Sequence, residues 1–153
     1  MRIHLFSIAR RAPGWAEAAC EDYLKRFGPG MDVRLREFAP KSADSVAQQR
    51  EREAEMLLRA VPAGAQLVAL DERGEPWSTA ELAARLRRWR EDAQDVVFAI
   101  GGAEGHGPAL CSAARAVWSL SRLTLPHALA RVVVVEQLYR AWSLLNNHPY
   151  HRA

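Results

Sequence analysis

A glycine-rich segment, Gly101–Gly107, is the first place in the chain where residue types and spacing suggest chemistry. It holds four glycines in seven residues and directly follows an apolar run. Glycine tolerates positive φ and lets a backbone approach a ligand closely, so such a loop could cradle a nucleotide or cofactor. The spacing is not Gly-x-Gly-x-x-Gly, and no Lys-Ser or Lys-Thr follows as in a P-loop. The residues alone therefore allow either a cofactor loop or a plain turn after a buried strand.

The polar, aromatic tail is a second candidate. Residues 146–152 read Asn-Asn-His-Pro-Tyr-His-Arg. Histidine can transfer a proton near neutral pH, tyrosine can stack on a base, and arginine can contact phosphate. Chain ends also fray often. The tail is therefore either disordered or part of a site.

A long helix, expected from Pro126 to about Asn146, leads into this tail and is apolar on nearly every side. Its run Val132–Val135 has poor helix propensity, so burial must hold it. A helix of this kind is covered all round, either by the core of its own chain or by a partner subunit, and we favour the partner. Glu136 and Arg140 are four residues apart, so they could pair on the helix surface or face a site.

The segments that must position these residues alternate between strand and helix patterns. Strands are expected at 2–9, 31–38, 66–70, 95–100 and 116–120, and helices at 13–27, 44–60, 78–91, 108–114 and 126–146. This alternation predicts an α/β fold with a mostly parallel sheet of five to six strands flanked by helices. Without a repeat or a low-complexity linker, we expect one domain over residues 1–153.

Strand composition refines this prediction. The strand at 31–38 alternates apolar and charged residues, as at a sheet edge, whereas the strand at 95–100 is apolar throughout and should be buried on both faces. The strand at 66–70 is expected to end in a turn at Asp71–Gly74. Ligands of open α/β sheets bind at the carboxyl ends of strands. The ends at Leu70-Asp71, Gly101–Gly107 and Leu120–Leu125 therefore predict one pocket.

The composition is that of an ordinary globular protein. The 153 residues carry a net charge of +3, which fits an anionic partner, although only two of the 21 basic residues are lysine and coding bias could explain that arginine excess. We expect no signal peptide, and no apolar run is long enough to span a membrane. Cys20 and Cys111 lack partners at metal-binding spacing, so we expect buried reduced thiols and no metal. These features predict a soluble, cytoplasmic protein.

Four stretches together resemble one family. They are Ala99–Gly105, Trp118–His127, Arg131–Trp142 and His148–Arg152. In combination they are similar to the RlmH family, the ribosomal large-subunit pseudouridine N3-methyltransferases of the SPOUT superfamily. The resemblance extends over the whole chain and includes Leu70-Asp71 and the Gly74-x-Pro76-Trp77-Ser78 motif.

The resemblance implies a fold and a cofactor. The family has a C-terminal deep trefoil knot, forms a homodimer and binds S-adenosylmethionine in the knot. Carried over residue by residue, the cofactor site comprises Leu70, Gly101, Leu120, Ser121, Arg122, Leu123, Thr124 and Leu125. Arg122 departs from the small residue of some relatives. Because the family reads adenosine largely through backbone groups, the site should survive this change, and Arg122 could instead contact RNA.

The resemblance also implies a reaction, which is methylation at N3 of a pseudouridine in 23S rRNA. Because no RNA-binding domain is attached, the expected substrate is rRNA within an assembled ribosomal particle. The tail would reach the partner subunit's cofactor site. There His151 would accept the proton or orient the substrate, Tyr150 would position or stack the base, and Arg152 and Arg140 would contact phosphate or the developing anion. Glu136 is a supporting candidate.

Three alternatives remain at this point. The protein could be a SPOUT methyltransferase acting on another RNA such as tRNA. It could be a non-catalytic, ribosome-associated binding protein that kept the fold. A dinucleotide-dependent oxidoreductase is disfavoured, because the chain lacks an early glycine fingerprint followed by an acidic residue.

Overall fold

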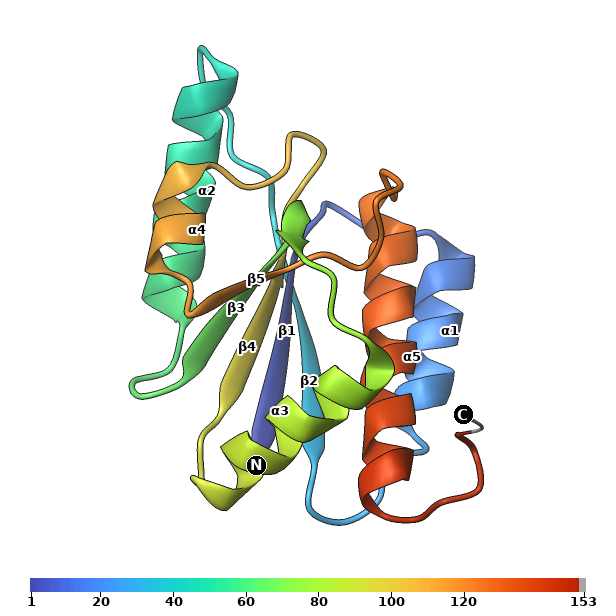
Figure 1. The fold of residues 1–153 in the computed structure, drawn as a ribbon. Coiled ribbons are helices and arrows are strands. Elements are labelled where there is room, and N and C mark those ends of the chain that lie inside the picture. The colour runs from blue at the N-terminus through green and yellow to red at the C-terminus, as the bar shows by residue number, and fades with distance from the viewer. Residues whose placement is uncertain (152–153) are drawn as a thin grey trace.

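The computed structural model describes residues 1–151, in which five strands alternate with five helices (Figure 1). In chain order these are β1 (Arg2–Ile8), α1 (Gly14–Leu24), β2 (Asp32–Phe38), α2 (Val46–Ala60), β3 (Gln66–Glu75), α3 (Thr79–Glu91), β4 (Val96–Ile100), α4 (Pro108–Ala113), β5 (Ala116–Trp118) and α5 (His127–Leu145). The predicted alternation of strands and helices is confirmed. A capping box starts α3, with Ser78 Oγ accepting from the Glu81 amide and Glu81 Oε2 accepting from the Ser78 amide.

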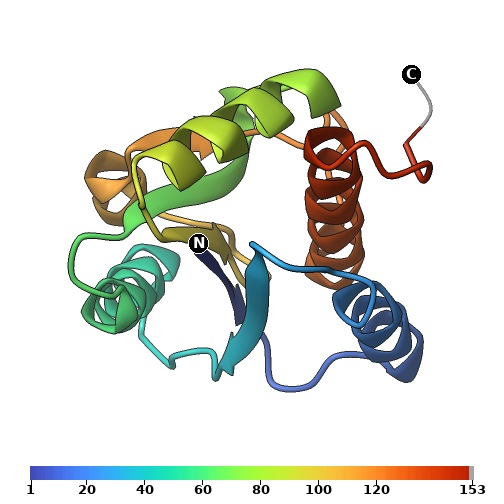
Figure 2. The ribbon, with the colours of Figure 1, turned by 90° about the horizontal axis from the view of Figure 1, so that it is seen from below.

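The strands form one parallel sheet in the order β2-β1-β4-β3-β5. Helices α1, α3 and α5 cover one face and α2 and α4 cover the other (Figure 2), and each face has its own apolar cluster. β2 lies at an edge and β4, buried along its whole length, lies in the centre, as their compositions predict. The predicted fold class, a parallel α/β sheet flanked by helices, is therefore confirmed.

β3 differs from the prediction. It continues to Glu75 instead of ending in a turn after Leu70, so the expected turn at Asp71–Gly74 is wrong. Both Leu70 and Glu75 pair with Trp118 of β5, so the residues between them bulge out of the ladder. The extension needs glycine at position 74, where a Cβ atom would lie 2.5 Å from the Val117 carbonyl oxygen. Residues 71–73 consequently stand at the carboxyl edge of the sheet.

A buried arginine fixes α5 against that same edge. Arg131 is only 1% exposed. It donates from Nη1 to Glu37 Oε1 and from Nη2 to Ser7 Oγ, both at 2.9 Å. Ser7 and Glu37 are register partners near the ends of β1 and β2. One guanidinium group therefore ties the last helix to two strand ends, and the same helix continues into the pocket described below.

We expect Glu37→Gln to lower the free energy of unfolding by about 2 kcal/mol, because it leaves a buried guanidinium without a counter-charge while keeping an acceptor oxygen. Glu55 pairs with Arg59 in the open, with side chains 62% and 78% exposed, so Glu55→Gln should change stability by less than about 0.5 kcal/mol. Urea denaturation of both variants measures the difference. Equal effects would show that the Arg131 pair is no stronger than a surface pair.

Candidate active site

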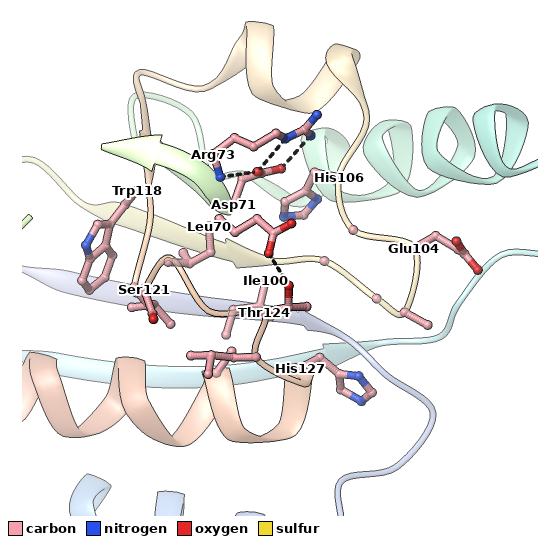
Figure 3. A pocket seen from close by; sticks show the side chains of 18 of the residues that line it. Leu70, Asp71, Arg73, Ile100, Glu104, His106, Trp118, Ser121, Thr124 and His127 are labelled. Atoms are coloured by element: carbon pink, nitrogen blue, oxygen red, sulfur yellow. Dashed lines mark hydrogen bonds and ion pairs between the residues drawn. The ribbon is translucent and has the colours of Figure 1, made fainter. Parts of the chain in front are cut away.

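A cavity of about 420 Å³ opens at the carboxyl edge of the sheet. Three strand ends and the start of α5 form it (Figure 3). Seven of the eight residues predicted for cofactor binding line it: Leu70, Gly101, Leu120, Ser121, Leu123, Thr124 and Leu125. The eighth, Arg122, is exposed and does not line it. The strand-end rule thus located the pocket correctly.

The glycine-rich loop forms one wall as a tight turn. The Gly105 amide donates to the Gly102 carbonyl at 3.0 Å, and Gly105 has φ +68°. A Cβ atom on Gly101 would lie 2.9 Å from the Gly105 carbonyl carbon. Because no side chain fits at Gly101, the pocket wall here is backbone, and this is the surface that a ligand could approach closely.

The loop between β5 and α5 forms the opposite wall and is organised by its own hydroxyl groups. Ser121 Oγ accepts from the Leu123 amide at 2.9 Å, and Ser119 Oγ donates to the Ser121 carbonyl at 2.9 Å. Thr124 Oγ1 donates to Glu72 Oε2 at 2.7 Å and so joins this loop to the β3 extension. The β5–α5 loop and the β3 extension therefore contact each other through side chains.

Asp71 and His106, which both line the pocket, have lowered pKa values. Asp71 accepts from Arg73 Nε at 3.0 Å and Nη2 at 3.1 Å, and these hydrogen bonds lower the pKa of the Asp71 carboxyl. His106 is 4% exposed, and its Nε2 lies 2.8 Å from the Ala99 carbonyl oxygen, which can only accept. Nε2 therefore carries the hydrogen, and burial lowers the pKa of the ring.

The strand-end rule placed Asp71 and the Gly101–Gly107 loop at the pocket, but it gave no role to four polar side chains there: Asp71, Glu72, Arg73 and His106. Glu72 and Arg73 were assigned only to a turn. The same rule could have included them, since polar residues directly after a buried strand face the ligand edge of an open sheet. The partner of Glu72, Thr124, lies far along the chain, so that contact has no local signal.

Tyr150 and His151 of the tail pack on their own subunit. The Tyr150 hydroxyl donates to Glu136 Oε1 at 3.0 Å and lies 3.1 Å from the Tyr23 hydroxyl. Burial first, and these hydrogen bonds second, raise the pKa of Tyr150 well above its usual range. His151 Nδ1 lies 3.2 Å from Ser143 Oγ. The disordered-tail alternative is therefore wrong for these residues, while Arg152 lies outside the described residues.

Glu136 organises this second cluster. Its Oε1 accepts from Arg140 Nε at 2.9 Å and Nη2 at 2.6 Å, in addition to the Tyr150 hydroxyl. The Arg140 guanidinium also stands 5.1 Å from the centre of the Tyr150 ring. The structure thus brings together Tyr150, Arg140 and Glu136, and His151 contacts Ser143, three residues after Arg140 on α5.

The pocket lies at the first turn of α5, and the tail packs along the middle and the last turns of the same helix (Figure 1). His127 lines the pocket, Glu136, the partner of Tyr150, comes nine residues later, and Ser143, the neighbour of His151, comes sixteen residues later. At 1.5 Å per residue these separations are about 14 Å and about 24 Å along the helix. Neither Tyr150 nor His151 lines the pocket of its own subunit.

Residues 1–151 contain neither a metal-binding cluster nor a membrane-spanning helix. No group of three or more histidine, cysteine, aspartate or glutamate side chains there could hold a metal ion, and no helix there could span a membrane. Neither cysteine forms a disulfide. Cys20 is buried as expected, but Cys111 is only partly buried, so the prediction for it was wrong.

The lowered pKa of His106 predicts a pH dependence of stability. The unfolded chain takes up a proton as the pH falls through the ordinary value of 6.5, while the folded ring stays neutral to lower pH. The free energy of unfolding should therefore fall between pH 7 and 5. The variant His106→Gln keeps a side-chain amide that can donate to the Ala99 carbonyl, and it should lose less stability over this pH range. The pKa of His4 is lowered too, but His4 is present in both proteins and so does not contribute to the difference between them. Parallel pH profiles from urea titrations would contradict this assignment.

Comparison with known proteins agrees with this geometry. A family model described as "Predicted SPOUT methyltransferase" matches residues 1–151. Proteins described as "Ribosomal RNA large subunit methyltransferase H" from Burkholderia mallei (strain SAVP1) and Burkholderia pseudomallei (strain K96243) are each 46% identical to the chain, with 100% of both sequences covered. A crystal structure of a probable methyltransferase from Bordetella pertussis Tohama I superposes with a TM-score of 0.61 at 20% identity, covering 92% of this chain and 96% of that chain, and it supports the fold alone. The chain therefore belongs to the SPOUT methyltransferase family, with the ribosomal RNA large subunit methyltransferase H proteins among its relatives.

Proposed function

We propose that this protein uses S-adenosylmethionine to methylate N3 of a pseudouridine in 23S rRNA within the assembled ribosome. The observation that carries the proposal is the cavity at three strand ends, lined by seven of the residues that the family resemblance assigns to the cofactor. The name of the relatives, ribosomal RNA large subunit methyltransferase H, supports the choice of rRNA. A ribosomal substrate implies a cytoplasmic location.

The pocket fits this cofactor in size and chemistry. Its volume of about 420 Å³ lies within the range of about 300–1,000 Å³ usual for small-molecule sites. Leu70, Ile100 and Leu125 offer apolar surface to an adenine ring, and the backbone at Gly101 is open to polar edges. When bound, the cofactor supplies a methyl group already activated on a sulfonium sulfur.

The tail cluster would act on the nucleotide. N3 of pseudouridine must lose its proton to become nucleophilic, and His151 would accept that proton or orient the base. The raised pKa of Tyr150 keeps its hydroxyl protonated at neutral pH, so Tyr150 would donate a hydrogen bond or stack rather than act as a base. Arg140, held by Glu136, would stabilise the imide anion or a phosphate, and Arg152 would do the same.

We infer that the active site is shared between two subunits of a homodimer. Tyr150 and His151 lie away from the pocket of their own subunit, and in a dimer each tail could reach the pocket of the partner subunit instead. α5 offers a surface for the pairing, because Leu129 is 38% exposed and Val132 and Val133 are only partly buried. As in the family, the C-terminal segment would form a deep trefoil knot.

Methylation of ribosomes tests the proposal directly. We expect the protein to transfer a labelled methyl group to purified ribosomes that lack the modification, and mass mapping to locate it at N3 of a 23S pseudouridine. Isolated 23S rRNA should react far more slowly. Gly101→Ala, which places a methyl group against the Gly105 backbone, should weaken cofactor binding at least about tenfold. Gly14→Ala, which meets nothing within 4 Å, is the matched control. Preferential methylation of tRNA would overturn the substrate assignment.

Mixed dimers test the shared site. At cofactor concentrations below the native dissociation constant, Gly101→Ala leaves a pocket mostly empty, and deletion of residues 149–153 inactivates a tail, so each variant alone should keep no more than about a tenth of the full activity. Equal mixing followed by subunit exchange should restore about a quarter of the full activity, because half of the dimers are mixed and each holds one intact pocket facing one intact tail. Sedimentation must show that both variants still dimerise. No recovery from dimers that have exchanged would contradict a site shared between subunits.

A further inference from the structure

Glu72 stands inside the pocket as a carboxylate that the reaction chemistry described so far does not use. It lies in the β3 extension, the segment predicted to be a turn. Its Oε2 accepts from Thr124 Oγ1 at 2.7 Å, and Thr124 belongs to the opposite wall. Both residues line the cavity. This hydrogen bond holds the Glu72 carboxylate at a defined position between the two walls.

Of the other two carboxylates that line the cavity, one is paired and one is turned outward. Asp71 is paired with Arg73 at 3.0 Å. Arg50 Nε donates to the main-chain oxygen of Glu104 at 2.8 Å, and the exposed Glu104 side chain points away from the cavity (Figure 3). No arginine, lysine or histidine within residues 1–151 forms an ion pair with Glu72. Its negative charge is therefore available to whatever occupies the pocket.

We propose that Glu72 makes the pocket prefer a sulfonium methyl donor over the thioether left after transfer, an inference that rests on the proposed function. Transfer breaks the bond between sulfur and the methyl carbon, and the electron pair stays on sulfur, so the positive charge disappears from the bound product. Donor and product otherwise share nearly the same shape. The Glu72 carboxylate is exposed to solvent but is held at the wall of the pocket, so it acts on this difference in charge with an effect that solvent partly screens. The same preference favours release of the product.

Glu72→Gln isolates the charge, because the amide oxygen can still accept from Thr124 and the side chain keeps its shape. Glu75→Gln is the matched control: it removes the same charge from the same strand, at a side chain that is 72% exposed and outside the cavity. Calorimetry on the full chain would measure the affinities for S-adenosylmethionine, for S-adenosylhomocysteine and for an analogue with an ammonium-bearing carbon in place of the sulfonium.

We expect Glu72→Gln to weaken both cationic ligands about five- to tenfold and S-adenosylhomocysteine less than about twofold, a difference typical of one partly screened charge a few ångströms away. Glu75→Gln should change none of the three affinities. If Glu72→Gln weakens all three ligands equally, the residue contacts a shared part of the ligand and the inference is wrong; unchanged affinities also overturn it. A full chain that binds none of the ligands would overturn the proposed cofactor as well, which separates the two failures.

Discussion

A guanidinium group with almost no access to solvent sets the position of α5, and the pocket depends on that position. Arg131 is bonded to side chains at the ends of β1 and β2, so the helix cannot slide along the sheet without leaving a buried charge unpaired. The turn of α5 that precedes Arg131 contributes Ala130 and His127 to the cavity. A contact that looks purely structural therefore determines where one wall of the site stands.

Local patterns predicted most of the secondary structure, because strand and helix periodicities are properties of neighbouring residues. The edge position of β2 and the central position of β4 also followed from composition alone. The order of the strands did not, since pairing depends on contacts between distant segments. The failure at β3 has the same origin. Asp71–Gly74 has the composition of a turn, but Gly74 passes close to Val117 of β5, and that contact keeps the backbone extended.

The candidate site could be predicted in outline but not in detail. The strand-end rule and the family resemblance together selected residues that do line one cavity, whereas the bond between Tyr150 and Glu136 was not predicted. What the sequence could not provide were the partners of single side chains. Glu72 bonds to Thr124 from a loop far along the chain, and Tyr150 is held partly by Tyr23 of α1. Such pairings come from packing, which has no periodic signature.

The low helix propensity of Val132–Val135 has a consequence for biosynthesis. Because α5 needs burial to be helical, it forms only against strands and helices that are already in place. All of these elements precede it in the chain and leave the ribosome earlier. One wall of the pocket and the anchor of the tail therefore appear together, after the sheet has assembled. A growing chain would therefore lack a complete pocket until this helix docks, and a site shared between two subunits would form only after that step.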